Sequence, residues 1–266
     1  MEWKINIPTK FEAIGNGSQG EVFCESPLVV DDKVIITPCG KKTTMVALNY
    51  KTSETIWTSE SIADSSFFVS PVLVQGKEKK LVVTSTKNHI LAVDFNTGKI
   101  AWSEKTSSPY FYIPLPVDKR VYFPNPKGNG KMLTIGDDLN SFHFKWSDTL
   151  AVSPMGGTVK LGNQIYGTYS NSKGLFCMDG ETGNIVSENK EFTSANLLVA
   201  DGMIYGYEDR TGRVFLMKPN GKNIDLVGSF KVKEGNGPHL AHMSIANGTL
   251  FIRHGKCLMA YDVKQL

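Results

Sequence analysis

The stretch from Leu91 to Trp102 reads LAVDFNTGKIAW and decides the fold class, because it is one copy of a unit that recurs along the chain. An apolar run ends at Asp94, a turn rich in Asn, Thr and Gly follows, and a second apolar run ends in a tryptophan. Similar segments occupy residues 45–57 and 176–187. A repeat of this period predicts a repeat fold that fills the chain. Six copies are recognised by one anchor residue each, spaced 39 to 45 residues apart: Asn49, Asp94, Asp138, Asp179, Lys218 and Asp262.

A second pattern precedes each anchor residue and consists of two short apolar runs separated by a turn. The turns include Asp201-Gly202 and Asn247-Gly248, and such pairs between β-rich runs are the strongest short signal for a β-hairpin. Each repeat therefore contains four short antiparallel strands. Four strands every ~40–45 residues are typical of a β-propeller blade, and no long stretch keeps the period of an amphipathic helix.

The two ends of the chain predict how the ring of blades closes. The sixth repeat reaches Leu266 four residues after its anchor Asp262, before a fourth strand can form. Residues 3–7, beginning with Trp3, form an outer strand that has no blade of its own. We predict one all-β domain over residues 1–266, a six-bladed β-propeller of four-stranded antiparallel blades. The N-terminal strand completes the last blade and closes the ring, which leaves no open sheet edge.

The composition is that of an ordinary globular protein. Of 266 residues, 41% are hydrophobic and 21% charged, and 29 Lys and Arg against 26 Asp and Glu give a net charge of +3. So small a surplus argues against nucleic-acid binding and against a polybasic membrane surface. No apolar run approaches the ~18 residues needed to cross a bilayer, so we expect no transmembrane segment. Residues 1–4 lack the apolar core of a secretory signal, so we also expect no signal peptide in this sequence.

The cysteines do not form a metal-binding or redox motif, because they are scattered and include no CxxC pair. Free thiols are the favoured interpretation, and a Cys24–Cys39 disulfide is the alternative. The four positions are Cys24, Cys39, Cys177 and Cys257.

The segment from Ala92 to Trp102 has the pattern A-x-D-x-x-T-G-x-x-x-W. This pattern resembles the tryptophan-docking repeat of the PQQ-like (quinoprotein alcohol dehydrogenase-like) β-propellers, and most closely the bacterial members that consist of a propeller and little else. The resemblance spans essentially the whole chain, but Ser187 and Leu226 stand where the fourth and fifth repeats would carry tryptophan. It implies that one blade docks on the next through four tryptophans: Trp3, Trp57, Trp102 and Trp146.

The best-known activity of that family is not expected here. Its quinoprotein dehydrogenases resemble longer, eight-bladed chains that hold PQQ over a calcium ion beside two adjacent cysteines. This sequence has no adjacent cysteines, two blades fewer and no recognisable set of calcium ligands. We therefore expect no cofactor, and a PQQ- or metal-dependent oxidoreductase stays as the alternative. The resemblance implies a binding or assembly scaffold in the periplasm or cell envelope.

The candidate ligand site is the mouth of the central channel, where propellers usually present their ligands. The loops that lead into the innermost strands carry aromatic, amide and histidine side chains, which suit a polar, ring-bearing ligand. The alternative is that these residues only shape corners and pack between blades. We predict eight ligand-binding residues: Gln19, Glu21, Phe67, Tyr110, Tyr112, Asn196, His239 and His242.

Catalytic and metal sites are not predicted. His239, His242 and His254 could approach a metal ion, but residues three apart on a strand face opposite sides and no carboxylate cluster stands nearby. Structural histidines are therefore the favoured interpretation, and no motif for nucleophilic catalysis is present. The predicted function is a monomeric, non-catalytic propeller that binds a protein, peptide or glycan. A structural partner in an envelope complex is a further possibility.

Overall fold

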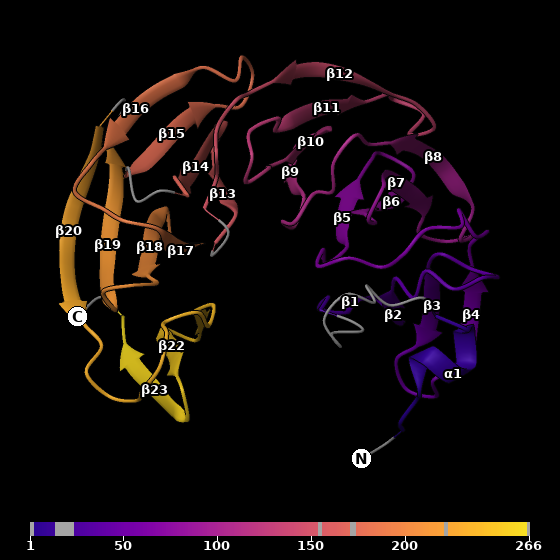
Figure 1. Cartoon of the computed structure of the whole chain (residues 1–266), viewed down its shortest axis with the longest axis horizontal. Helices are drawn as coiled ribbons and strands as arrows, with labels where there is room; N and C mark the ends of the chain where they lie inside the picture. Colours follow the sequence, from indigo (N-terminus) through magenta and orange to yellow (C-terminus); the bar gives the residue numbers. More distant parts are fainter. Residues whose placement is uncertain (1–2, 14–23, 154–155, 171–173, 221–222, 265–266) are drawn as a thin grey trace. The chain divides into compact units, whose positions relative to one another are not determined.

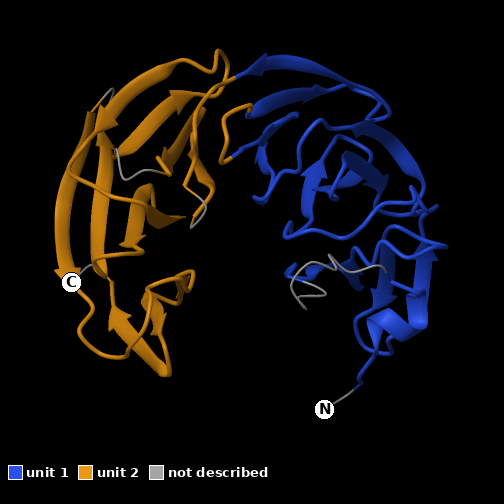
Figure 2. Ribbon diagram, in the orientation of Figure 1, with its two compact units in different colours: residues 1–125, 130–147 blue, residues 126–129, 148–266 orange. Residues whose placement is uncertain are grey.

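The computed structural model describes residues 3–13, 24–153, 156–170, 174–220 and 223–264 (Figure 1). The chain divides into two compact units. Unit 1 comprises residues 1–125 and 130–147, and unit 2 comprises residues 126–129 and 148–266 (Figure 2).

Unit 1 contains three four-stranded antiparallel sheets, in which strands that follow one another in the chain are hydrogen-bonded neighbours. Sheet one consists of β1 (Leu28–Val30), β2 (Lys33–Ile36), β3 (Val46–Asn49) and β4 (Thr55–Thr58). Sheet two consists of β5 (Val72–Gln75), β6 (Lys80–Ser85), β7 (His89–Asp94) and β8 (Ile100–Lys105). Sheet three consists of β9 (Leu115–Val117), β10 (Arg120–Phe123), β11 (Lys131–Ile135) and β12 (Phe142–Ser147).

Unit 2 repeats this arrangement, with three strands in its last sheet among the described residues. Sheet four consists of β13 (Thr158–Leu161), β14 (Gln164–Thr168), β15 (Leu175–Asp179) and β16 (Ile185–Asn189). Sheet five consists of β17 (Ala195–Ala200), β18 (Met203–Glu208), β19 (Arg213–Asn220) and β20 (Asn223–Lys231). Sheet six consists of β21 (Ser244–Ala246), β22 (Thr249–His254) and β23 (Cys257–Asp262).

The hairpin turns have the backbone geometry that the sequence predicts. Asp201 and Gly202 have φ angles of 50° and 71°, and Asn247 and Gly248 have φ angles of 51° and 73°. Two successive positive φ angles match the right-handed twist of the flanking strands, and Asn, Asp and Gly adopt them most readily. The described residues thus confirm the all-β fold and the six antiparallel sheets.

The repeated motif forms a closed turn between the third and fourth strands of a sheet. In sheet two, the side chain of Asp94 accepts hydrogen bonds from the backbone N–H groups of Asn96 and Thr97, at 3.0 and 2.8 Å. Gly98 follows with a φ of 76°. Asp179 accepts the same pair of bonds in sheet four. Asn49 accepts the corresponding pair in sheet one. The anchor residues of these three sheets therefore recur because each holds this turn, whereas the anchor Lys218 lies within β19 and pairs with Asp225 of β20.

Trp57 connects sheet one to sheet two. Its indole Nε1 donates a hydrogen bond to the carbonyl oxygen of Phe95, 2.9 Å away, directly after the anchor Asp94. Its ring also covers Gly98, where a Cβ atom would stand 2.7 Å from the ring. A side chain at position 98 would therefore displace the tryptophan. This contact belongs to the apolar core between the two sheets, which includes Ile35 and Val93.

The two other tryptophans of the described sheets each lie against an aromatic ring. Trp102 is 7% exposed and its ring lies 4.7 Å from that of Phe142, inside the core between sheets two and three. The ring of Trp146 lies 5.4 Å from that of Tyr122. The general role of these residues in docking blade on blade stays a prediction.

Residues 3–7 differ from the predicted outer strand, which is a correction to the sequence interpretation. They form no strand, and helix α1 (Ile7–Phe11) begins at the end of the segment. Asn6 starts the helix because its side chain accepts the N–H of Thr9 at 3.0 Å. Pro8 stands in the first turn, where its missing N–H breaks no hydrogen bond.

The N-terminal segment is held on sheet one. Trp3 donates its indole N–H to the carbonyl oxygen of Tyr50, 2.8 Å away. Tyr50 follows the anchor Asn49, so Trp3 makes the same bond to sheet one that Trp57 makes to sheet two. Closure of a ring by this segment stays a prediction, as does the single domain over residues 1–266.

Candidate functional site

The predicted ligand-binding residues fall into three groups. Gln19 and Glu21 lie outside the described residues. The remaining six divide equally between the two units, so each unit is described by itself. Unit 1 carries Phe67, Tyr110 and Tyr112, and unit 2 carries Asn196, His239 and His242.

In unit 1, three phenylalanines from two loops form a cluster that we call the aromatic cluster: Phe67, Phe68 and Phe111. The ring centroid of Phe67 lies 4.8 Å from that of Phe68 and 4.9 Å from that of Phe111, and both contacts are edge-to-face. All three side chains are half-buried, and Ile113 close by in the chain is 49% exposed. Edge-to-face rings of this kind stabilise one another while part of their apolar surface stays open.

The loop that carries two of these rings is fixed by a buried carboxylate. Asp64 accepts hydrogen bonds from the Thr86 hydroxyl at 2.5 Å, from the backbone N–H of Asn88 at 2.8 Å and from Nδ1 of His89 at 2.8 Å. The amide of Asn88 and the backbone N–H of Ser65 donate to the other oxygen. The loop before sheet two is therefore tied to the turn between β6 and β7.

These bonds decide the protonation state of Asp64. Burial alone would raise its pKa, but the hydrogen bonds from Thr86, from His89 and from two backbone N–H groups outweigh burial and lower the pKa from 3.8 to about 2. Asp64 is thus a buried carboxylate at neutral pH. The sequence did not identify it, because its partners lie 22 to 25 residues further along the chain.

The two predicted tyrosines are part of the core of unit 1. Tyr110 is 3% exposed and packs against Phe123, with ring centroids 5.5 Å apart. Tyr112 is 6% exposed, and burial raises the pKa of its hydroxyl far above the ordinary value. Neither ring shares the open surface of the aromatic cluster.

In unit 2, His239 takes part in a chain of rings. The hydroxyl of Tyr207 is hydrogen-bonded to its Nδ1, and its ring stacks on that of His254 with centroids 3.8 Å apart. Both ring nitrogens of His254 lie 2.7 Å from backbone carbonyl oxygens, those of Glu234 and Gly237. His254 therefore fixes the loop that carries His239.

Asn196 and His242 have contrasting surroundings. Asn196 is 1% exposed and stands opposite Tyr207 on the neighbouring strand, so both side chains share one face of sheet five. Among the described residues, neither polar atom of the Asn196 amide has a hydrogen-bond partner. His242 is exposed. Unit 2 thus brings Asn196 and His239 close to the same tyrosine. That these residues bind a ligand stays a prediction.

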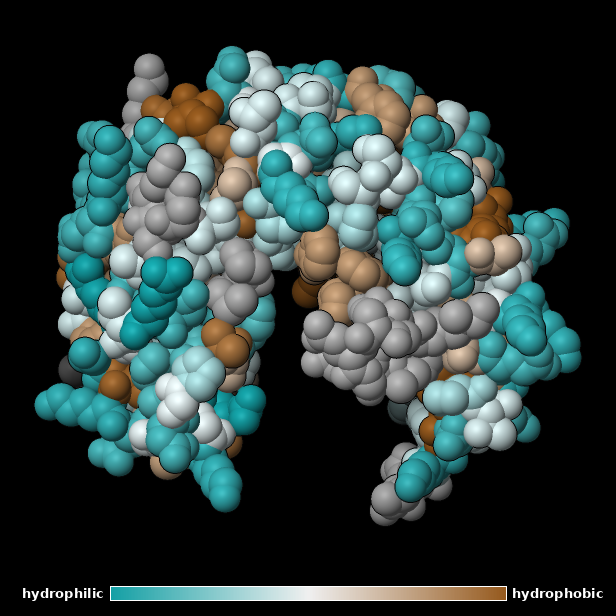
Figure 3. Space-filling view, in the orientation of Figure 1, coloured by the Kyte–Doolittle hydropathy of each residue, from teal (hydrophilic) through white to brown (hydrophobic). Residues whose placement is uncertain are grey.

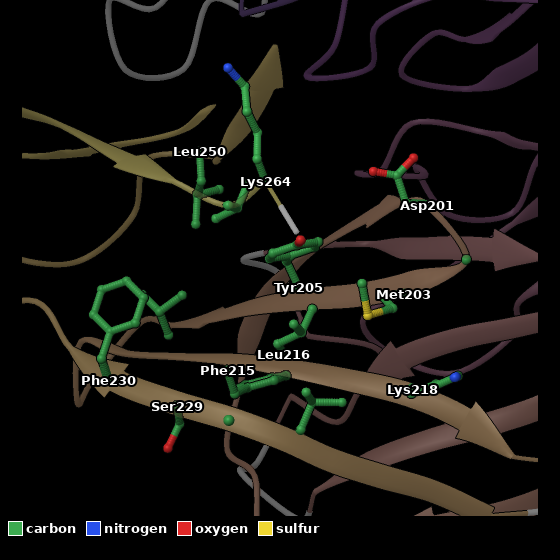
Figure 4. A pocket seen from close by; sticks show the side chains of 15 residues that line it. Asp201, Met203, Tyr205, Phe215, Leu216, Lys218, Ser229, Phe230, Leu250 and Lys264 are labelled. Carbon is green, nitrogen blue, oxygen red and sulfur yellow. The ribbon is translucent and has the colours of Figure 1, made fainter. Parts of the chain in front are cut away.

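Unit 2 also contains a groove that the sequence did not predict, which we call the unit 2 groove. It lies where β18, β19 and β20 meet β22 and the residues after β23, and its volume is about 750 Å³ (Figure 4). Most of its lining is apolar, with charged groups from Asp201, Lys218 and Lys264. The apolar lining residues are Met203, Tyr205, Val214, Phe215, Leu216, Val227, Phe230, Leu250 and Val263.

The described residues contain no group of three or more His, Cys, Asp or Glu side chains placed to hold a metal ion. They also contain no helix that is both long and apolar enough to cross a membrane. Cys39 is a buried free thiol, so the Cys24–Cys39 disulfide is not formed. Burial, with smaller contributions from Glu25 and Asp64, raises the pKa of the Cys39 thiol well above its ordinary value.

Solved structures with the same fold define the class of protein. BamB from Moraxella catarrhalis aligns with a TM-score of 0.63 at 17% identity, over 88% of this chain and 67% of that one. Quinohemoprotein alcohol dehydrogenase from Comamonas testosteroni aligns with a TM-score of 0.57 at 13% identity, over 86% of this chain and 51% of that one. At these identities the likeness shows the fold alone, which is a β-propeller.

The family follows from the sequence itself. Residues 3–224 match the family described as outer membrane protein assembly factor BamB, and this chain belongs to that family. An uncharacterized protein of Rickettsia conorii is 23% identical over 175 residues, which is 60% of this chain. The chain covers only 40% of that relative's length. The predicted resemblance to PQQ-like propellers is confirmed.

Proposed function

We propose that this chain is a non-catalytic scaffold that binds a partner protein through the aromatic cluster of unit 1. The observation that carries the proposal is the cluster itself, in which Phe67, Phe68 and Phe111 contact one another but remain half-buried. Aromatic side chains held in a fixed arrangement are the typical centre of a protein interface.

The surroundings of the cluster support this role. Asp64 fixes the loop before binding, so little conformational entropy is lost when a partner orders the rings further. Ile113, two residues after Phe111, is a further exposed apolar side chain of the same loop. Figure 3 shows hydrophilic side chains mixed with smaller hydrophobic areas over the visible face. An extended apolar surface beside polar residues favours a protein or peptide over a glycan.

The family supports a partner and a place in the cell. A family described as an outer membrane protein assembly factor is consistent with a partner protein, and we infer from it a periplasmic or envelope location. Fractionation of the native host, with the protein it makes detected by an antibody raised against this chain, tests that location. Recovery of the chain in the cytoplasmic fraction would contradict it.

Site-specific crosslinking tests the binding surface. A photoreactive amino acid replaces Phe67 in the native host, and a matched control replaces Val29, which is 62% exposed in the same unit. We expect one recurrent protein crosslinked from position 67 and not from position 29. The product should disappear when Phe111→Asp is added and persist with Val29→Asp. Equal labelling from both positions would contradict the proposal.

The alternative, a PQQ-dependent oxidoreductase, rests on the fold likeness to a quinohemoprotein dehydrogenase. The calcium ion that accompanies PQQ prefers several oxygen ligands, carboxylates among them. The described residues contain no group of three or more His, Cys, Asp or Glu side chains placed to hold a metal ion. The donor set therefore does not fit, and we propose that the chain works without a cofactor. A rise in melting temperature with PQQ and calcium would contradict this, because a ligand of the native state must stabilise it.

A further inference from the structure

Unit 2 contains a second cavity, which we call the Arg213 pocket, and its volume is about 520 Å³. It lies beside the loop between β16 and β17, close to the beginning of β19 and the end of β20. Every residue of its lining belongs to unit 2, so the pocket is formed within one compact unit. The lining consists of Glu191, Thr193, Glu208, Thr211, Arg213, Ser229, Phe230 and Lys231.

The cations of the pocket lie on the face of sheet five that is turned toward sheet four. Arg213 and Phe215 are two residues apart on β19, so their side chains share one face of the sheet. Phe215 packs in the apolar core that sheets four and five share. Lys231 pairs with Arg213, and Ser229 pairs with Phe215. In Figure 4 the side chains of Ser229 and Phe230 leave β20 in opposite directions, as this alternation requires.

Two positive charges stand directly opposite each other in the pocket. Arg213 of β19 and Lys231 of β20 are paired residues, and like charges in such a pair repel and destabilise a sheet. Glu191 offsets part of this repulsion, because its Oε1 accepts a hydrogen bond from Nη2 of Arg213 at 2.7 Å. Lys231 makes no ion pair within the described residues. An additional anion in the pocket would therefore be stabilised by both cations.

The guanidinium group of Arg213 is fixed in orientation before any ligand arrives. It lies over the ring of the buried Phe192, with 5.3 Å between Cζ and the ring centroid, and the bond to Glu191 holds one of its edges. A guanidinium has five N–H donors in a planar fork that matches a carboxylate, and the bond to Glu191 uses one of them. Donors thus remain for a second carboxylate.

Thr193 adds a hydroxyl group to these donors. Its Oγ1 is buried and has no hydrogen-bond partner among the described residues, although buried polar groups in native proteins are nearly always paired. The carboxylate of Glu208 does not take this hydroxyl, because its two oxygens accept the backbone N–H of Thr193, at 3.0 Å, and the hydroxyl of Thr211. The Thr193 hydroxyl is therefore a donor that the pocket itself does not use.

We propose that the Arg213 pocket binds a carboxylate group, which accepts hydrogen bonds from Arg213, Lys231 and Thr193. Glu191 indicates this chemistry, because it is a carboxylate that already lies on Arg213. Its side chain is 50% exposed, and an ion pair this exposed contributes little to stability, so an incoming carboxylate displaces it or binds beside it. The inference goes beyond the proposed function, since the pocket lies in unit 2 and does not involve the aromatic cluster.

A small organic acid and an acidic side chain of a peptide share this chemistry, and two probes separate them. The full chain is titrated with succinate and, in a second experiment, with a capped tripeptide that has glutamate at its centre. Binding is followed by NMR at the backbone amides of Thr193, Ser229 and Lys231. We expect saturable shift changes at these positions with at least one probe, and the tighter probe identifies the source. The same tripeptide with glutamine should cause no change, and no saturable change with either acidic probe overturns the proposal.

Two variants test the donors. Lys231→Ala should weaken binding of the tighter probe at least about fivefold, because it removes a charged donor. Thr193→Val should weaken binding about threefold but should not lower the stability of the chain, because it removes a buried hydroxyl that has no partner in the described residues. Lys99→Ala, which removes an exposed lysine of unit 1, is the matched control and should leave affinity unchanged. Equal effects of Lys231→Ala and Lys99→Ala contradict the site.

Glu191→Gln gives a test of opposite sign. It removes a competing carboxylate and one negative charge, so binding should become at least about twofold tighter. Glu104→Gln makes the same change at an exposed position of β8 and should leave affinity unchanged. Weaker binding with Glu191→Gln would show that the carboxylates of the lining attract a cationic group instead, and it overturns the proposal. The NMR spectrum of each variant establishes that it is folded.

Discussion

Replacing Asp64 by asparagine should destabilise the chain and loosen the loop that carries the aromatic cluster. Asparagine keeps the size of the side chain but has an NH₂ group in place of one carboxylate oxygen. That group donates hydrogen bonds and cannot accept those that the oxygen accepts from its neighbours. The affected donors include the backbone N–H of Asn88 and Nδ1 of His89, both 2.8 Å from Asp64. The variant therefore leaves at least one buried donor without an acceptor.

The expected loss follows from the pKa of Asp64. A carboxyl whose pKa falls from 3.8 to about 2 on folding stabilises the native state by about 2.5 kcal/mol at neutral pH. An unsatisfied buried donor costs about 1 to 3 kcal/mol. Because these two effects share the same hydrogen bonds, we expect Asp64→Asn to lower the free energy of unfolding by about 2 to 4 kcal/mol.

Urea unfolding at several pH values measures both the loss and its cause. The pKa of Asp64 is lowered on folding, so its contribution is complete above about pH 4 and disappears as the pH falls through about 2. The difference between wild type and Asp64→Asn should therefore shrink between pH 4 and pH 2. Asp31→Asn, which removes an exposed partner of Lys80, is the matched control and should change stability by less than about 1 kcal/mol. Equal stability of Asp64→Asn and wild type at pH 7 would refute the reasoning.

Three further predictions concern single contacts. Gly98→Ala should lower the free energy of unfolding more than Gly202→Ala, because both positions have a positive φ but only a Cβ at position 98 meets the ring of Trp57. Urea unfolding of the two variants compares the losses directly, and equal losses would contradict the contact. Burial raises the pKa of Glu25 to about 7, so its ionisation destabilises the native state as the pH rises through 7. Glu25→Gln should therefore stabilise the chain at pH 8 and have little effect at pH 5, and thermal melts at both pH values check this. Burial, and to a smaller extent the neighbouring His254 and Lys231, lower the pKa of His239 below 6.5, so the free energy of unfolding should fall as the pH drops below that value. His239→Asn should flatten this part of the pH profile of stability. An unchanged slope would exclude His239 as its source.

The sequence predicts the parts of the fold that depend on local contacts. The anchor turn around Asp94 is recognisable because its hydrogen bonds lie within three residues. The hairpin turn at Asp201-Gly202 is recognisable because its φ angles restrict the residue types. In the N-terminal segment, Asn6 and Pro8 form a helix start, and this local signal outweighs the apolar pattern that predicts a strand over residues 3–7, so α1 begins at Ile7.

The candidate site depends on contacts between distant residues, and the sequence predicts it only in part. Phe67 is half-buried in a cluster with other rings, whereas Tyr110 and Tyr112 are buried in the core although they belong to the same kind of loop. Composition alone cannot separate these two outcomes. Asp64 and the unit 2 groove were not predicted, because the first depends on a turn 22 to 25 residues away and the second on packing between two sheets.

The affinity of the chain for its crosslinked partner tests the central claim most directly. The protein captured from position 67 is purified, and its dissociation constant is measured by calorimetry with wild type, Phe111→Asp and Val29→Asp. Removing one aromatic centre of an interface typically costs at least 2 kcal/mol, so we expect Phe111→Asp to weaken binding by about 30-fold or more. Val29→Asp should bind like wild type. Equal affinity of all three forms would contradict the claim that the aromatic cluster of unit 1 binds the partner.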